Sequence, residues 1–372
     1  MFEISISDFI KYFMSNHSDN KKILRGVSLF SSAGIGEAFF KEIGIKIVVA
    51  NELLEDRAKL YSRLYSDTDM ITGDILDENI FKEIVDKSGD KIDFLIATPP
   101  CQGMSIAGKN RNLETMLNDQ RNHLVFKIID FINIKKPGYI LIENVPNFLK
   151  LELPFKGRLL TLEKILFNLY GKDYEIDTRV MDTSEYGVPQ KRNRAIIKMH
   201  KKGLRWDWPA REKAKTVEEA IGYLPRLESG QKSKIPWHFA RKHAGKHILW
   251  MKHTATGKSA FENKEYYPKK DNGEIIKSYI TTYRRIKWDE PSPTITMRND
   301  AISSQLNVHP GRKLKDGTYS DARVLTPLEL MILSSLPEKW SVPRDTPEIL
   351  LRKCLGESVP PLLLKKVISG IR

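Results

Sequence analysis

Cysteine is scarce in this sequence: the 372 residues contain two, Cys101 and Cys354. Two thiols are too few for a disulfide framework, so the composition predicts a protein of a reducing compartment, the cytoplasm. No stretch approaches the roughly 20 apolar residues that span a bilayer. The N-terminal residues carry acids and lack the basic and long apolar segments of a secretory signal. These absences argue against a membrane protein and against a disulfide-stabilised secreted protein.

Acidic residues are few in one region. Residues 191–290 hold 25 Lys and Arg but 11 Asp and Glu, so this stretch alone accounts for the net charge of +14. The same stretch contains five of the six tryptophans, namely Trp206, Trp208, Trp237, Trp250 and Trp288. A basic region interleaved with aromatic side chains suits a phosphate backbone and unstacked bases. A solvated basic surface without a ligand is the alternative reading of the charge.

The first 200 residues alternate short apolar runs with longer amphipathic ones from residue 24 on, a pattern typical of a parallel α/β sheet. We expect strands at 24–30, 45–50, 92–97, 139–143, 174–181 and 195–199, and helices at 36–43, 54–64, 79–85, 122–134 and 160–169. After residue 201 the alternation fades, apart from a helical pattern at 216–224, and helical periodicity returns at 326–336, 347–355 and 360–371. The chain is therefore expected to contain an α/β domain at 1–200, a smaller irregular domain at 201–321, and helices at 322–372 that return to the first domain.

Candidate binding residues follow the predicted strands, beyond whose carboxyl ends such sheets bind ligands. Residues 30–37 read FSSAGIGE, and their glycines permit a ligand to approach the backbone closely. A dinucleotide fingerprint would place glycine at position 39, which is Phe39, so a nicotinamide cofactor is disfavoured. Glu52 ends the next strand, where an acid commonly accepts hydrogen bonds from ribose hydroxyls, and Asp74 could reach an adenine amine. A tight turn, a helix N-cap or a surface acid would explain the same residues without a ligand.

A thiol and an acid follow two further strands. Residues 99–103 read PPCQG, and the two prolines fix the backbone so that Cys101 is presented at the ligand-binding edge. Cys354 falls on an amphipathic helix instead, and it is predicted to be buried and inert. Glu143 ends a buried apolar strand, so its pKa should be raised, which suits a group that donates a proton or a hydrogen bond near neutral pH. An exposed strand-end carboxylate is the alternative.

Two arginines precede the last predicted strand. Arg192 and Arg194 alternate with Asn193 in the segment QKRNR, so both should point to one side of an extended chain. They could clamp a phosphate or a base carbonyl, or be surface charges.

Taken in order, these segments resemble the DNA cytosine-C5 methyltransferase family, in particular its bacterial type II modification methylases. The resemblance runs from Val27 to the C-terminus through FSSAGIG, NE, GD, PPCQG, ENV, QKRNR, RVLTPLE at 323–329 and GESVP at 356–360. Single motifs of this set are weak, whereas their order and the separation of 42 positions from Cys101 to Glu143 are specific. The resemblance implies a Rossmann-like, doubly wound SAM-dependent methyltransferase domain and a target-recognition domain at 201–321.

The resemblance also implies a reaction, the transfer of a methyl group from S-adenosyl-L-methionine (SAM) to C5 of a flipped-out cytosine in a specific double-stranded DNA sequence. Cys101 would add to C6 of the base, because C5 is a poor nucleophile until covalent addition makes it enamine-like. Glu143 would hydrogen-bond N3 and the exocyclic amine. Arg194 matches the position that holds the cytosine O2, and Arg192 matches a second arginine of the base pocket. Flipping the base costs a few kcal/mol.

Further positions carry over from the family by motif. The predicted cofactor contacts are Phe30, Ser32, Ala33, Gly34, Ile35, Gly36, Glu52, Leu53, Asp74, Ile75, Pro100, Leu124, Ser358 and Val359. The predicted DNA contacts are Gln102, Gly103, Ser105, Gln190, Thr294 and Thr296. Three positions depart from the family pattern, because Ser32 and Ile35 replace glycines and Glu357 replaces an asparagine. Ser32 and Ile35 fall in the cofactor turn itself and bear on its backbone geometry, whereas Glu357 would place a negative charge near the methionine end of the cofactor.

Several alternatives stay open on the sequence. His243, His247 and His253 could suggest zinc, but no cysteine or clear carboxylate accompanies them, so no metal is expected. An RNA cytosine methyltransferase with the same core is the nearest rival; the long basic region favours duplex DNA. A non-catalytic DNA-binding protein is disfavoured by the intact catalytic set. The expected setting is a monomeric prokaryotic or phage modification enzyme with a restriction endonuclease as its functional partner, whose DNA target the sequence does not reveal.

Overall fold

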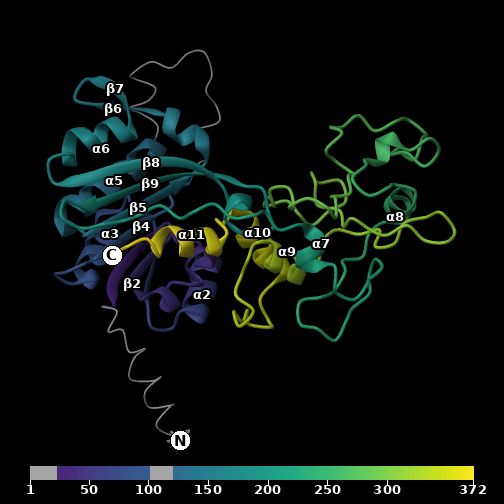
Figure 1. The fold of residues 1–372 in the computed structure, drawn as a ribbon, viewed down its shortest axis with the longest axis horizontal. Coiled ribbons are helices and arrows are strands. Elements are labelled where there is room, and N and C mark those ends of the chain that lie inside the picture. Colours follow the sequence, from purple (N-terminus) through teal and green to yellow (C-terminus); the bar gives the residue numbers. More distant parts are fainter. Residues whose placement is uncertain (1–22, 101–119) are drawn as a thin grey trace, which may run out of the picture.

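A computed structural model describes residues 23–100 and 120–372. Its centre is a seven-stranded sheet in the order β3-β2-β1-β4-β5-β9-β8 (Figure 1). The strands are β1 (Leu24–Leu29), β2 (Ile45–Glu52), β3 (Asp69–Thr72), β4 (Phe94–Ala97), β5 (Tyr139–Asn144), β8 (Tyr174–Asp182) and β9 (Asn193–Lys201). The six predicted strands are all present within two residues at each end, and β3 is an addition.

The sheet is mixed rather than parallel. Neighbours from β3 to β5 pair in parallel, whereas β9 is antiparallel to both β5 and β8. Strand β8 therefore runs in the same direction as β5, and the prediction of a parallel sheet is wrong for β9 alone. The physical reason is the short link between Asp182 and Asn193, because a parallel crossover needs a dozen or more residues, usually with a helix.

Helices cover both faces of the sheet, so that the central strands β1, β4 and β5 are buried, whereas β3 and β8 are partly exposed. On one face, α3 (Glu78–Ser88), α5 (Gln120–Lys135) and α6 (Leu162–Tyr170) pack in a large apolar cluster. On the other face, residues of α2 (Glu55–Leu64) and α11 (Pro361–Ile368) share a cluster with Trp206. The C-terminal helix thus lies on the sheet that the N-terminal half of the chain forms (Figure 1).

Two predicted helices begin differently from expectation. The segment 36–43 forms two short 3-10 turns, η1 (Ile35–Glu37) and η2 (Lys41–Ile43), rather than one helix. The helix predicted at 160–169 begins at Leu162 instead. The residues before it form a hairpin of β6 (Glu152–Phe155) and β7 (Arg158–Thr161), whose last residues overlap the predicted range. At its tip Lys156 and Gly157 have φ of 47° and 74°, and two successive left-handed residues are what a tight two-residue hairpin turn requires.

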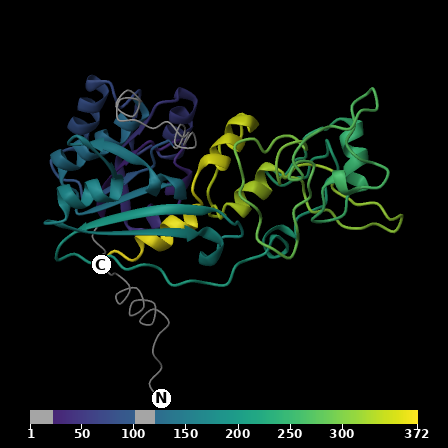
Figure 2. The same ribbon diagram turned by 90° about the horizontal axis from the view of Figure 1, so that it is seen from above.

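The remaining chain forms a less regular part with a small core of its own. Its helices are α7 (Val217–Ile221) and the unpredicted α8 (Gly245–Lys252), and an apolar cluster gathers around Trp250, Tyr283 and Val308. Figure 2 shows α9 (Pro327–Leu333) and α10 (Glu348–Glu357) between this part and the sheet. A third cluster joins α7, α9 and α10 to Ala33 and Ile35 of the turn after β1. No helix among the described residues is long and apolar enough to cross a bilayer.

Candidate active site

The carboxyl ends of three neighbouring strands are tied together by polar contacts. The Ser31 amide donates a 2.9 Å hydrogen bond to the Asn51 carbonyl, which joins β1 to β2. The Asn51 side-chain amide in turn donates to the carbonyls of Ile71 (3.0 Å) and Gly73 (3.1 Å), which joins β2 to β3. These ties bring the turn after β1 and the strand-end acids Glu52 and Asp74 to one edge of the sheet.

The turn after β1 has an unusual backbone. Phe30, Ser32 and Gly34 all have left-handed φ values, 61°, 49° and 72°. Gly34 must be glycine, because a Cβ there would lie 2.4 Å from the Tyr65 ring. A residue at the end of β2 holds Ser32 in place: the Ser32 amide donates a 2.9 Å hydrogen bond to Oε2 of Glu52. The other oxygen of Glu52 accepts the Leu54 amide at 2.9 Å, so this carboxylate organises both the turn and the start of α2.

The predicted cofactor residues divide into exposed and buried groups. Leu53 is 59% exposed, Pro100 and Asp74 are exposed, and Phe30, Ser32, Gly36, Leu124 and Ser358 are half-buried. Gly34 and the carboxylate of Glu52 are buried beneath the turn. The side chains of Ala33, Ile35, Ile75 and Val359 lie in the apolar clusters, where they pack against core residues. Only the backbone of these last four is left to touch a ligand.

Glu143 and Arg194 form a buried pair at the ends of the adjacent strands β5 and β9. Arg194 Nε lies 2.6 Å from Glu143 Oε1, and the two side chains are 10% and 9% exposed. Burial raises the pKa of Glu143, although the charges of Arg194 and Arg192 oppose that rise. The raised pKa confirms the direction that the sequence predicts for an acid ending an apolar strand.

The chain leading to the predicted nucleophile is fixed at the same edge. The Asn144 side chain donates a 2.9 Å hydrogen bond to the Pro99 carbonyl, and the Thr98 hydroxyl donates to the Phe30 carbonyl at 2.9 Å. Pro99 is thereby placed beside the end of β5. The residues that follow, namely Cys101, Gln102, Gly103 and Ser105, lie outside the described residues, so their predicted roles stay predictions.

The segment before β9 joins three parts of the chain. Arg192 donates hydrogen bonds to the carbonyls of Ile295 (2.6 Å), Gly356 (2.9 Å) and Glu357 (2.8 Å). Gln190, predicted to contact DNA, is 1% exposed and accepts the Ile295 amide at 3.2 Å. The Thr294 hydroxyl donates to the Lys191 carbonyl at 2.8 Å, and both Thr294 and Thr296 are exposed. Residues about a hundred positions apart therefore meet at the site, with Gln190 in a structural role beneath them.

The order of these segments and their geometry agree with one family. Residues 24–372 match the family model described as C-5 cytosine-specific DNA methylase. The chain belongs to this family. It is a DNA cytosine-5-methyltransferase, with the α/β methyltransferase fold that its motifs predict.

Individual relatives of the methyltransferase cover nearly its whole length. It is 55% identical over 352 residues to the type II methyltransferase M1.HgaI of Avibacterium volantium, covering 94% of this chain and 99% of that protein. It is 27% identical to M1.HphI of Haemophilus parahaemolyticus, with 97% and 90% covered. A prophage-encoded putative DNA modification methyltransferase of E. coli has a similar structure, with a TM-score of 0.65, 19% identity and coverage of 93% and 98%. At that identity the likeness of structure concerns the fold.

Two of the five tryptophans that the methyltransferase carries at 191–290 are too buried to stack on bases. Trp206 is 4% exposed, packs against Phe94 and Tyr139, and donates to the Val367 carbonyl at 2.7 Å. Trp250 is 3% exposed, and the other three are partly buried. Trp206 fills the apolar cluster of the sheet, and Trp250 fills the small core of the irregular part. Exposed aromatic rings come from tyrosines instead, with Tyr223 73% and Tyr279 75% exposed.

His243, His247 and His253, the candidates for a metal site, pack against neighbouring groups in the structure. The Nε2 of His243 accepts the Val324 amide at 3.3 Å, and burial lowers the pKa of His243 to about 4. His247 packs against Trp250 and Tyr283, and His253 stacks on Tyr266 with ring centroids 3.8 Å apart. Within the described part of the chain, no three His, Cys, Asp or Glu side chains are grouped to hold a metal.

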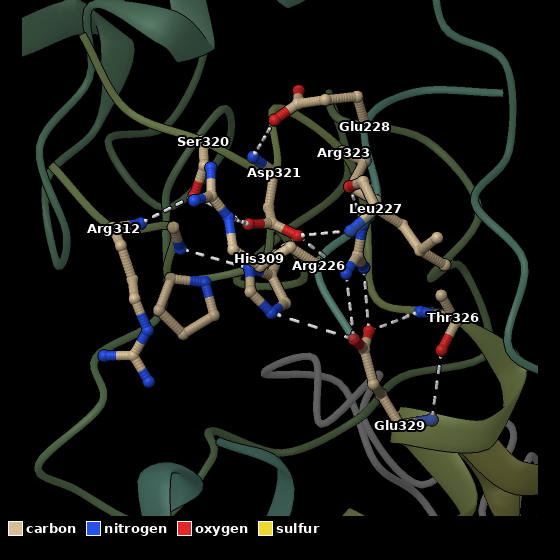
Figure 3. Close-up of polar contacts among 12 residues, drawn as sticks. Arg226, Leu227, Glu228, His309, Arg312, Ser320, Asp321, Arg323, Thr326 and Glu329 are labelled. Atoms are coloured by element: carbon tan, nitrogen blue, oxygen red, sulfur yellow. Dashed lines mark hydrogen bonds and ion pairs between the residues drawn. The ribbon is translucent and has the colours of Figure 1, made fainter. Parts of the chain in front are cut away.

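The RVLTPLE motif forms a buried charge network where the irregular part meets α9 (Figure 3). Arg323 donates to both oxygens of Glu329, at 2.8 and 2.9 Å, and to Asp321 at 3.0 Å. Arg323 is fully buried, and His309 faces both acids at 3.7 and 3.9 Å. Burial lowers the pKa of His309 to about 4, so the ring is neutral at physiological pH. The motif therefore has a structural role: its charge network forms the joint that connects the irregular part of the chain to α9.

Cys354 matches its prediction. The side chain is fully buried in α10, and burial raises its pKa to about 12, so the thiol is inert near neutral pH.

Proposed function

We propose that this methyltransferase moves the methyl group of SAM to C5 of a flipped-out cytosine within a specific sequence of double-stranded DNA, through a covalent bond between Cys101 and C6. The observation that carries the proposal is the buried Glu143–Arg194 pair at the carboxyl edge of the sheet. A buried acid with a raised pKa beside a fixed guanidinium suits the N3 and O2 edge of a cytosine. The Asn144–Pro99 contact brings the segment that leads to Cys101 to the same place.

The turn after β1 and the two strand-end acids fit SAM. Each oxygen of Glu52 accepts one backbone amide, and a carboxylate has about four acceptor positions, so ribose hydroxyls can be accepted in addition. Leu53, 59% exposed, offers an apolar surface beside exposed Asp74, a combination that suits the face and the amine of adenine. When bound, SAM supplies an electrophilic methyl group on a sulfonium. The remaining contacts assigned to SAM are those predicted by motif, with Ala33, Ile35, Ile75 and Val359 contributing through the backbone.

The reaction then depends on groups of the chain. The Cys101 thiolate forms a bond to C6, and the electron pair of the C5–C6 double bond shifts to C5. That pair would form the bond to the methyl group as the methyl–sulfonium bond breaks, with S-adenosylhomocysteine as the leaving group. Glu143 steadies that ring by holding a proton or hydrogen bond at N3, and Arg194 holds the O2 carbonyl. Loss of the C5 proton and expulsion of the Cys101 thiolate restore the aromatic ring after methylation. Arg192 fixes the segments 295 and 356–357 around the pocket.

Duplex DNA is the proposed substrate, read by residues 201–321, with residues 1–200 and 322–372 as the catalytic part. The basic excess of residues 191–290 and the exposed Thr294 and Thr296 next to the site support this division. The relatives M1.HgaI and M1.HphI are named type II methyltransferases, which supports a place in a restriction-modification system with a partner endonuclease. We propose that the enzyme acts as a monomer.

Two steps test the proposal. Base-resolution mapping of 5-methylcytosine in DNA from cells that express the chain identifies the target sequence. Purified enzyme, with SAM and duplex DNA carrying 5-fluorocytosine at the mapped position, should then form a covalent adduct that survives denaturation, because fluorine at C5 prevents the final elimination.

Cys101→Ala is the matched variant: it should form no adduct and transfer no labelled methyl group, yet bind the duplex within about threefold of wild type. Turnover by Cys101→Ala would remove Cys101 from the mechanism. Labelled methyl transfer onto transfer RNA but not onto duplex DNA would favour the RNA methyltransferase reading instead.

A further inference from the structure

Two of the positions that depart from the family pattern, Ser32 and Glu357, are in direct contact. The Ser32 hydroxyl donates a 2.5 Å hydrogen bond to Oε1 of Glu357. The other oxygen, Oε2, lies 2.8 Å from Nη2 of Arg57 on α2, and these two side chains are 17% and 19% exposed. One largely buried carboxylate therefore links the turn after β1, helix α2 and the end of α10.

Ser32 needs such support because of its backbone conformation. Its φ of 49° lies in the left-handed region, which costs a residue other than glycine about 1 kcal/mol or more. Glycine, usual at this position in the family, adopts that conformation without the cost. In this chain the Ser32 amide and hydroxyl are instead bound by two carboxylates on different elements, Glu52 and Glu357.

Glu357 is itself held firmly. Its own carbonyl and that of Gly356 accept hydrogen bonds from Arg192 at 2.8 and 2.9 Å, so the backbone at the end of α10 is fixed to the segment before β9. Its side chain is fixed by Arg57. A carboxylate anchored through both backbone and side chain can transmit its position to Ser32.

We propose that Glu357 is a positioning residue, whose carboxylate, fixed by Arg57, holds Ser32 in the left-handed conformation that the cofactor turn requires. The inference rests on the proposed function, because that function assigns the turn to SAM. Glu357 acts through Ser32 and touches neither the methyl group nor the cytosine.

The test is a double-mutant cycle read by equilibrium binding. Calorimetric affinities for SAM and for S-adenosylhomocysteine are measured on the full chain, well below its unfolding temperature, for wild type, Ser32→Ala, Glu357→Gln and the double variant. Each single variant should bind both ligands about tenfold more weakly, and the double variant no more weakly than the weaker single one, because both changes remove the same contact. In methylation assays the KM for SAM should rise with kcat within about twofold.

Two further variants sharpen the result. Ser32→Gly in the Glu357→Gln background should regain affinity to within about threefold of wild type, because glycine needs no support at this φ. Glu55→Gln is the matched control, since Glu55 is an exposed carboxylate on the same helix as Arg57, paired with Lys59 at 2.6 Å. Its affinities should equal those of wild type.

Three outcomes overturn the inference. Additive losses in the cycle, or single variants that bind SAM as wild type does, refute it while SAM use by the wild type stands. Variants that unfold at a lower temperature yet keep wild-type affinity would give Glu357 a structural role alone. A wild-type chain that binds neither ligand refutes the inference together with the proposed function.

Discussion

At the scale of single residues, burial decides the chemistry of several acids, and Glu37 is the clearest case outside the proposed reaction. It follows the turn after β1, and both of its oxygens accept hydrogen bonds at 2.6 Å, one from Ser28 and one from Tyr61. Burial raises the pKa of Glu37 to about 7, because the two hydroxyls only partly replace the lost hydration. The acid under the turn after β1 is therefore largely neutral in mildly acidic solution.

This pKa predicts how stability depends on pH. A carboxyl group whose pKa is raised on folding stabilises the fold fully below its unfolded value of about 4.5, and that contribution is lost as pH rises through about 7. Between pH 5 and pH 8, Glu37→Gln should therefore gain about 2 to 3 kcal/mol of unfolding free energy relative to wild type. Denaturant unfolding at both pH values measures this change, with the exposed Glu55→Gln as the control. Parallel pH profiles for wild type and Glu37→Gln would contradict the assigned pKa.

A residue with a shifted pKa can be predicted from the sequence where the neighbouring residues along the chain already indicate that it is buried. Glu143 could be predicted to have a raised pKa because an uninterrupted apolar strand precedes it. The pairing of Ser32 with Glu357 could not be predicted, since 325 positions separate them and only the fold brings them together. The burial of Trp206 and Trp250 could not be predicted for a related reason: composition does not say which side chains the core of each part of the fold needs.

At the scale of elements, the joint between the irregular part and α9 depends on one buried arginine. Arg323 satisfies Asp321 and Glu329 together, and Glu329 also accepts the Thr326 amide at 2.7 Å within the capping box of α9. Removing one member of such a network leaves uncompensated buried charge, which is far more costly than losing an exposed pair.

Arg323→Met should therefore lower the unfolding free energy by about 3 to 5 kcal/mol. The matched control is Arg312→Met, because Arg312 pairs with Glu218 at 2.6 Å with both side chains more than 40% exposed. That change should cost less than about 1 kcal/mol. Chemical unfolding of the two variants gives the comparison, and similar losses in both would mean that the buried network contributes little.

Elements with strong local patterns were predictable, and elements without them were not. The long apolar strands and the amphipathic helices were located to within a few residues. The strand β3 is four residues long and half exposed, so it has no clear alternation, and α8 has apolar residues around its surface rather than on one face. The reversed direction of β9 could not be predicted either, because it follows from the short link between β8 and β9 rather than from the side-chain pattern.

At the scale of the whole molecule, charge is distributed unevenly. The excess of +14 lies between residues 191 and 290, and the rest of the chain is balanced. Within this stretch Lys232, Lys234, Lys242 and Lys252 are exposed, so their charges are available to a polyanion. Such a distribution predicts that DNA is attracted to the irregular part of the molecule rather than to the sheet.

Salt dependence measures this attraction directly. Each lysine that neutralises one DNA phosphate contributes about 0.9 to the slope of log affinity against log salt concentration. Changing Lys232, Lys234, Lys242 and Lys252 to glutamine should therefore reduce the slope by about 2 to 4, if half or more of them meet phosphates. The control changes four exposed lysines of the sheet domain, Lys46, Lys91, Lys164 and Lys172, and should leave the slope as it is. Because both variants lose the same formal charge, an equal change in slope would show that net charge alone governs binding, and an unchanged slope in the first variant would place the duplex on another surface.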